Sequence, residues 1–162
     1  MNKKILFVGH GQAGKDTACE YLEKITGLIN AGTTSKYLAK YVASELNISI
    51  EEAYNRRRES EEMRIFWYEI GNKVRKDNPA LLVREAFNYG DISGGVRDIE
   101  EILAVKKEKI CDIIVWIENK RVKKDPTLNF NSKEADIVIE NNWSLEEFYE
   151  RIERLAKFAN LL

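Results

Sequence analysis

The residues best suited to chemistry lie in a glycine-rich segment near the amino terminus. Gly9 and Gly14 enclose four residues and Lys15 follows directly, which is the spacing of a loop that binds nucleotide triphosphates. An apolar stretch precedes the segment and a helical pattern follows it. Backbone N–H groups of a loop with little side-chain bulk can surround phosphate oxygens, and the positive end of the next helix adds to the attraction. The sequence therefore predicts a phosphate-binding loop (P-loop).

Each position of this loop has an expected part in holding nucleotide phosphates. Lys15 supplies a mobile cation, Thr17 supplies a hydroxyl near a magnesium ion, and Asp16 stands where Ser or Thr is commonest. The residues expected to contact the cofactor ATP are Gly9, Gly11, Gln12, Ala13, Gly14, Lys15, Asp16 and Thr17. Thr17 and Asp16 are the residues expected near Mg²⁺. The plain alternative is a tight turn between a strand and a helix.

His10 is the only histidine and lies inside this loop. We interpret it as a bystander whose side chain points outward, rather than as a catalytic base, because phosphoryl transfer relies mainly on positioning and charge.

Length and composition favour one domain. The chain has 162 residues, enough for a single core and too few for two domains of ordinary size. The formal net charge of -1 gives no global positive field for long nucleic acid, so small anionic ligands held by local arginines fit better. Cys19 and Cys111 are far apart and lack metal-binding spacing, so we expect reduced thiols in a cytoplasmic protein, in the host cytoplasm if the protein is viral. We expect neither a signal peptide nor a membrane span.

Apolar periodicity predicts strands that alternate with helices along the chain. Strands are expected just before Gly9 and at 28–31, 91–97, 112–118 and 135–140. The expected helix starts are marked by possible caps at Ser35, Ser49, Asp98 (with Glu101) and Ser144, and by Pro79 at a first helical position. Alternation of this kind predicts a three-layer α/β/α sandwich with a parallel five-stranded sheet, of the P-loop NTPase type, which binds ligands at the carboxyl ends of the strands.

Further charged residues are expected at the same edge of the sheet. Arg97 follows the third strand, where two glycines open the strand end. The basic segment from 119 to about 133, with Arg121, is interpreted as a mobile lid rather than a plain surface loop. Residues 56–58 are three consecutive arginines, interpreted as a solvated face, and the apolar stripe along 63–74 is interpreted as core.

The sequence resembles the P-loop kinases of small phosphorylated metabolites, and most closely the deoxynucleoside monophosphate kinases of bacteriophages. The resemblance extends over nearly the whole chain. Its most specific part is the sequence GKDT at 14–17, because that family carries a GKDT-type ending of the loop. It also includes Arg64 and Arg75 with a glycine between them, the segment 95–101, and the segment 136–142 before a final helix that begins Leu-Glu-Glu.

The resemblance implies one kinase domain over 1–162, with a helical segment at about 35–88 that closes over the acceptor and a lid at about 119–133. It implies an enzyme that transfers the γ-phosphoryl group of ATP, with Mg²⁺, to a (deoxy)nucleoside monophosphate. Lys15 and Arg121 would be catalytic. The residues implied to bind the acceptor are Lys36, Arg64, Tyr68, Arg75 and Arg97. The expected partner is this small molecule, with no long nucleic acid and no membrane, for a monomer or homodimer.

Two other functions remain open from the sequence. One is a P-loop kinase that acts on another small phosphorylated or hydroxylated acceptor, including a modified pyrimidine. The other is a nucleotide-binding regulatory switch. The switch is less favoured, because no expected strand ends in the acidic pair of a hydrolytic site and the guanine-reading sequence Asn-Lys-x-Asp does not occur.

Overall fold

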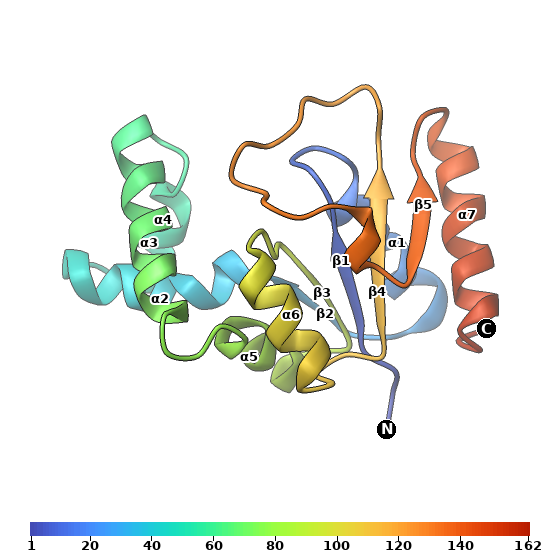
Figure 1. Ribbon diagram of the computed structural model, residues 1–162, viewed down its shortest axis with the longest axis horizontal. Helices are drawn as coiled ribbons and strands as arrows, with labels where there is room; N and C mark the ends of the chain where they lie inside the picture. Colours follow the sequence, from blue (N-terminus) through green and yellow to red (C-terminus); the bar gives the residue numbers. More distant parts are fainter.

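Five parallel strands form the centre of the molecule in the computed structural model, which describes residues 1–162. The strands are β1 (Ile5–Val8), β2 (Asn30–Thr33), β3 (Ile92–Gly94), β4 (Ile113–Glu118) and β5 (Ile137–Glu140). Their spatial order is β2-β3-β1-β4-β5, and every neighbouring pair is parallel. In Figure 1 the carboxyl ends of β1, β4 and β5 lie at the same edge of the sheet as the long β4–β5 connection. The predicted parallel five-stranded sheet is confirmed.

Seven helices surround this sheet (Figure 1). They are α1 (Lys15–Thr26), α2 (Thr34–Leu46), α3 (Ile50–Arg56), α4 (Glu61–Arg75), α5 (Leu81–Tyr89), α6 (Ile99–Lys107) and α7 (Leu145–Phe158). A short 3-10 helix, η1 (Ser132–Glu134), lies within the β4–β5 connection. Helices α1 and α7 cover one face of the sheet, α5 and α6 cover the other, and α2 to α4 form a helical segment with its own core. None of these helices combines the length and the apolar composition needed to cross a membrane.

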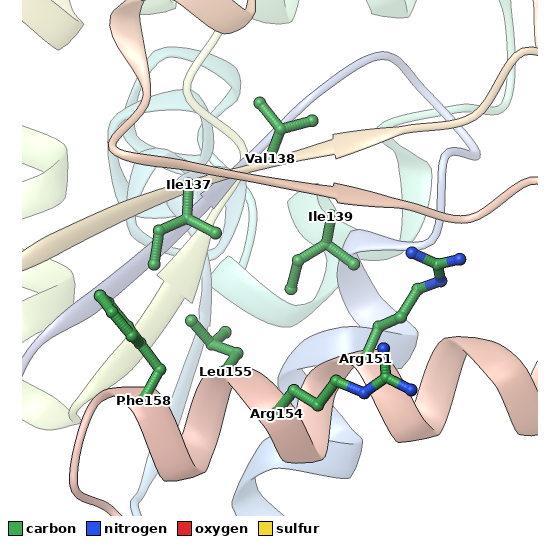
Figure 2. A pocket seen from close by; sticks show the side chains of 7 residues that line it. All are labelled: Ile137, Val138, Ile139, Arg151, Arg154, Leu155 and Phe158. Carbon is green, nitrogen blue, oxygen red and sulfur yellow. The ribbon is translucent and has the colours of Figure 1, made fainter.

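An apolar groove runs between the edge strand β5 and α7. Figure 2 shows Ile137 and Ile139 facing Leu155 and Phe158 of α7, with the side chain of Arg151 extending along the rim. The groove encloses about 250 Å³ and has no acidic or amide side chain in its walls. It lies along β5, away from the glycine-rich loop.

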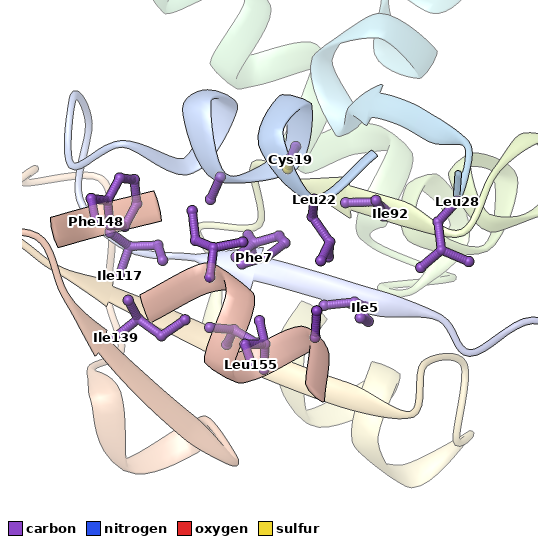
Figure 3. Close-up of a cluster of buried hydrophobic side chains, with 14 of the residues drawn as sticks. Ile5, Phe7, Cys19, Leu22, Leu28, Ile92, Ile117, Ile139, Phe148 and Leu155 are labelled. Atoms are coloured by element: carbon purple, nitrogen blue, oxygen red, sulfur yellow. The ribbon is translucent and has the colours of Figure 1, made fainter. Parts of the chain in front are cut away.

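Both faces of β1 are buried, which is why all of its residues are apolar. Ile5 and Phe7 belong to the core shared with α1 and α7, whereas Leu6 and Val8 belong to the core shared with α5 and α6. Successive side chains of a strand point to opposite faces, so a strand covered on both sides must be apolar throughout. Figure 3 shows the first of these cores, with Phe7 surrounded by side chains from α1, α7 and β4. This packing fixes the start of the glycine-rich loop.

The second strand begins two residues later than predicted. Leu28 is buried, but Ile29 is exposed and its carbonyl oxygen accepts bonds from the N–H groups of residues 91 and 92, so regular pairing starts only at Asn30. Helix α2 then starts at Thr34 after Thr33, whose side chain makes no capping bond. The predicted cap Ser35 therefore lies inside the helix.

The prediction was more accurate for helices whose first turn is capped by a side chain. The hydroxyl oxygens of Ser49 and Ser144 each accept a bond from the N–H three residues later, and the Asp98 carboxylate accepts one two residues later. The predicted start at Pro79 is wrong, because Asn78 to Ala80 form a turn and α5 begins at Leu81. Leu103 is 49% exposed, whereas Ile102 and Val105 are the residues of α6 buried against the sheet.

Candidate active site

Two glycines shape the loop between β1 and α1. Gly9 has a φ of +148°, and a Cβ atom there would lie 2.7 Å from the carbonyl oxygen of Ile117 in β4. Gly14 has a φ of +114°, and its Cβ would lie 2.6 Å from Nδ2 of Asn141 and 3.2 Å from the ring of Phe148. L side chains rarely adopt such φ values and no side chain fits at these distances. The glycine spacing thus lets the loop pack closely against β4 and the start of the carboxyl-terminal region.

Lys15 bends back over this loop. Its Nζ donates to the carbonyl oxygens of Gly9, at 2.8 Å, and His10, at 2.7 Å. Burial, together with the positive charge of Arg97, lowers the pKa of Lys15 to about 8. An ammonium group that is partly desolvated and near a second cation gains from a nearby anion. An anion at the mouth of the loop would therefore interact favourably with this ammonium group.

The first turn of α1 adds donors to the loop. Gly14 is its N-cap residue and supplies no side-chain cap, so the first N–H groups of the helix have no capping partner. Asp16 is exposed and Thr17 is half-buried in this turn. Their oxygen atoms are the ligand type that Mg²⁺ prefers, and Mg²⁺ commonly takes one or two protein ligands besides phosphate oxygens and water. No cluster of three or more acidic, His or Cys side chains exists that would hold a metal ion by itself.

The remaining predicted loop residues have different environments. Ala13 is buried, and its carbonyl oxygen accepts a bond from Nδ2 of Asn141 at 2.8 Å. Gln12 is exposed, with a φ of +63°, and Gly11 is half-buried. Asn141 was not predicted as a site residue, although it lies in the carboxyl-terminal segment that carries part of the family resemblance.

Arg97 meets the β4–β5 connection beside the loop. Its Nη1 lies 3.0 Å from Oδ2 of Asp125 and donates to Oγ1 of Thr127 at 3.2 Å. Oδ1 of Asp125 accepts bonds from both the N–H and the hydroxyl of Thr127. Burial acts to raise the pKa of Asp125, but these bonds and the charges of Arg97 and Lys15 lower it overall. Sequence reasoning missed Asp125, which lies within a stretch that is otherwise mostly basic.

His10 links the same connection to the loop. Its Nδ1 accepts a bond from the backbone N–H of Asp125 at 2.8 Å, and its ring packs edge-on against Trp116 with centroids 5.5 Å apart. The prediction that the His10 side chain points outward is wrong. The residue anchors the segment after β4 against the loop.

Arg121, the predicted lid arginine, lies in the turn after β4. Its Nη2 donates to the carbonyl oxygen of Asn141 at 3.1 Å and its Nε to Oδ1 of Asn119 at 3.4 Å. The arginine whose charge acts on Lys15 in this conformation is Arg97, not Arg121. The arginine that acts on the loop lysine is therefore Arg97, in the segment after β3.

A cavity of about 630 Å³ lies between α4 and the start of α6. Two predicted acceptor-binding residues, Tyr68 and Arg75, line it, together with Asn129 from the β4–β5 connection. The N–H of Asn129 donates to the carbonyl oxygen of Arg97 at 3.1 Å, so the cavity adjoins the Arg97 region. The other three predicted acceptor-binding residues are not in its walls. Arg97 lies beside it, whereas Lys36 is exposed in the first turn of α2 and Arg64 is exposed in the first turn of α4.

Glu101 is the most deeply buried charged group of this cavity wall. Its side chain is 2% exposed, its Oε2 lies 3.8 Å from Nε of Arg75, and its Oε1 has no hydrogen-bond partner. Burial raises the pKa of Glu101 to about 7, against the opposing effect of Arg75. The predicted capping role of Glu101 is wrong, because its side chain is buried. The burial of Glu101 was not predicted, since an acidic residue three positions after Asp98 resembles a capping box.

Comparison with solved structures assigns the architecture. A shikimate kinase from Acinetobacter baumannii in complex with shikimate has a TM-score of 0.55 at 15% identity, over 99% of this chain and 96% of that chain. A sugar kinase from Janibacter sp. HTCC2649 has a TM-score of 0.51 at 14% identity, over 99% and 96%. The fold is that of the P-loop kinases. A shikimate kinase from Bacteroides thetaiotaomicron adds a TM-score of 0.50 at 11% identity, over 98% of both chains.

Neither a protein-family model nor a curated protein sequence matches the chain. At the identities found with the solved structures, the likeness shows the P-loop kinase fold and leaves the acceptor open.

Proposed function

We propose that the protein transfers the γ-phosphoryl group of ATP, with Mg²⁺, to the phosphate of a (deoxy)nucleoside monophosphate. The observation that carries the proposal is the position of Lys15, folded over an uncapped glycine loop and acted on by the charge of Arg97. A cavity of about 630 Å³ adjoins the Arg97 region and is large enough for a small acceptor. The GKDT ending of the loop, which resembles the bacteriophage enzymes, favours a nucleoside monophosphate.

In this mechanism the loop holds the donor. Lys15 and the loop N–H groups bind the outer phosphates of ATP, and Thr17 and Asp16 orient the magnesium shell. Mg²⁺, when bound, neutralises charge on the transferring phosphate oxygens. Gly9 and Gly14 keep the loop in the shape that points its N–H groups inward.

The acceptor is held on the other side of Lys15. Arg97 binds the acceptor phosphate, whose oxygen forms the new P–O bond while the bond to the leaving ADP breaks. An ionised phosphate needs no general base. Tyr68 and Arg75 contact the rest of the acceptor, while Lys36 and Arg64 join the site when the helical segment at about 35–88 closes. Arg121, on the lid at about 119–133, stabilises the transferring group.

A hydroxyl acceptor is the second candidate, and one observation favours it. Asp125 places a carboxylate 3.0 Å from Arg97 and within the field of Lys15. A hydroxyl loses its proton as it attacks, and a carboxylate in this position can accept that proton. Asp125→Asn separates the two candidates. It would disable phosphoryl transfer to a hydroxyl acceptor but not to a phosphate acceptor, which needs no base.

The test is ADP formation from ATP and Mg²⁺ with a panel of deoxy- and ribonucleoside monophosphates and, in parallel, hydroxylated acceptors. We expect one or a few monophosphates to stimulate turnover strongly, and Lys15→Ala to abolish it. Lys24→Ala, an exposed lysine in the last turn of α1, is the matched control and keeps full activity. ATP binding without stimulation by any monophosphate would show that the acceptor is wrong.

A further inference from the structure

The cavity beside α4 contains a guanidinium and a carboxyl group that do not satisfy each other. Nε of Arg75 lies 3.8 Å from Oε2 of Glu101, which is beyond hydrogen-bond length, and Oε1 of Glu101 has no partner. A carboxyl group removed from water and left without its hydrogen bonds destabilises a folded protein, so such groups are rare outside functional sites. Nη2 of Arg75 donates to Oδ1 of Asn72 at 3.2 Å, so the group left without a partner is the carboxyl of Glu101.

This pair is separate from the phosphate side of the site. Arg97 contacts Asp125 and Thr127, and its charge acts on Lys15. The charged partner of Arg75 is Glu101. The two arginines therefore belong to different ends of one site.

Asn129 joins the two ends. Its N–H donates to the carbonyl oxygen of Arg97, its Oδ1 accepts a bond from the N–H of Ile99 at 2.6 Å, and its side chain lines the cavity that contains Arg75 and Glu101. A molecule whose phosphate reaches Arg97 would thus extend along Asn129 toward Glu101.

Electrostatics disfavours a phosphate at the Arg75 end. A phosphate bound to Arg75 would lie close to the buried carboxyl of Glu101, and two anions in a partly desolvated cavity repel each other strongly. A neutral group with a hydrogen-bond acceptor and a donor side by side suits the pair better. The guanidinium would donate to its carbonyl oxygen or ring nitrogen, and the carboxyl would accept from its N–H.

We propose that Arg75 and Glu101 form the recognition end of the acceptor pocket and read the hydrogen-bonding edge of a nucleobase, while Arg97 takes the acceptor phosphate. The inference rests on the proposed function and sharpens it, since there Arg75 only contacts the part of the acceptor beyond its phosphate. Glu101 thereby becomes a specificity-determining residue, and its unpartnered oxygen is explained as a position that the base fills.

The experiment measures inhibition of the monophosphate-stimulated reaction by two fragments of the acceptor. One fragment is the deoxynucleoside of the preferred monophosphate, which carries the base without phosphate. The other is ribose 5-phosphate, which carries phosphate without a base. For Glu101→Gln we expect the Ki of the deoxynucleoside to rise at least about 10-fold, as for loss of a charged hydrogen bond, with the Ki of ribose 5-phosphate unchanged. Arg97→Ala should show the reverse pattern.

Arg75→Gln gives the same test from the other member of the pair, so the result does not depend on one variant folding well. Glu146→Gln, an exposed glutamate at the start of α7, is the control and leaves both Ki values unchanged. An equal rise in both Ki values for Arg75→Gln would make Arg75 a phosphate clamp and overturn the inference. Unchanged values for both pocket variants would overturn it as well. Failure of the proposed function shows separately, as an absence of stimulation by any monophosphate in the unmodified protein, and overturns both.

Discussion

The two sides of the proposed active site differ in the groups that form them. On the phosphate side, the loop is shaped by backbone conformation, with glycines packed against the backbone of β4 and bonds from Lys15 and Asn141 to loop carbonyl oxygens. On the acceptor side, the wall consists of charged side chains from α4 and α6, and its central ion pair is 3.8 Å apart. The loop is thus held mainly by backbone groups, whereas the acceptor side has a buried carboxyl oxygen without a hydrogen-bond partner.

The cores behind the two sides differ in the same way. The loop emerges from β1, which is buried on both faces between the two largest apolar clusters. Helix α4 belongs to a third cluster, which joins it to α2, α3 and part of α5. A separately packed helical segment can move relative to the sheet more easily than the loop can. Closure of the segment at about 35–88 over the acceptor stays a prediction of this arrangement.

After Lys15→Ala, the largest effect is expected from removing Arg121, the predicted lid arginine. For Arg121→Ala we expect kcat to fall by about 10³, because a guanidinium that reaches the transferring group only in the transition state contributes to rate rather than to binding. The dissociation constant of ATP, measured by calorimetry, should stay unchanged, since the bonds of Arg121 go to Asn119 and Asn141 rather than to loop atoms. Arg58→Ala, an exposed arginine, is the control. An unaffected kcat would leave Arg97 as the arginine that stabilises the transfer.

A smaller effect is expected from a methyl group on the phosphate side. Gly14→Ala places a Cβ 2.6 Å from Nδ2 of Asn141 at a φ of +114°, which must displace the amide that holds the Ala13 carbonyl. We expect about 2–3 kcal/mol lower stability and at least about 10-fold weaker ATP binding. Gly27→Ala is the matched control, because Gly27 has a φ of +75° with no atom near its Cβ position. It should cost about 1 kcal/mol and leave ATP binding intact. Equal binding by both variants would contradict the close packing of the loop.

The smallest effect on ATP binding is expected from a change on the acceptor side, which alters the pH dependence of stability instead. Because burial raises the pKa of Glu101 from 4.5 to about 7, the folded protein binds more protons than the unfolded chain between these values. The unmodified protein should therefore lose stability relative to Glu101→Gln as pH rises from 4.5 to 7, by about 2.5–3 kcal/mol, and the difference should level off about one unit above pH 7. Denaturant unfolding at intervals of pH measures the difference. A difference that stays flat over this range would mean that Glu101 titrates normally.

Local sequence signals predicted the scaffold and the phosphate loop. The apolar residues of β1, the glycine spacing and the caps at Ser49 and Ser144 depend on neighbours close in the chain, and the structure has the corresponding elements. Where the boundary depended on sheet pairing, as at Asn30, the prediction was two residues early.

The missed residues have partners far away in the chain. Asp125 is held by His10, which lies 115 positions earlier, and by Arg97. Glu101 gains its character from burial beneath α4. No spacing rule indicates such contacts, because they arise only when helices and loops from separate parts of the chain pack together.

The contact between Gly14 and the carboxyl-terminal region has a consequence for how the protein is made. The loop leaves the ribosome well before the residues that pack on it, because Asn141 lies 128 positions after Ala13 and Phe148 follows later still. A nascent or truncated chain that lacks α7 carries every residue of the loop without its support. A ligand that bound the folded loop would in turn stabilise the packing of α7, so loss of α7 should weaken ligand binding at the loop.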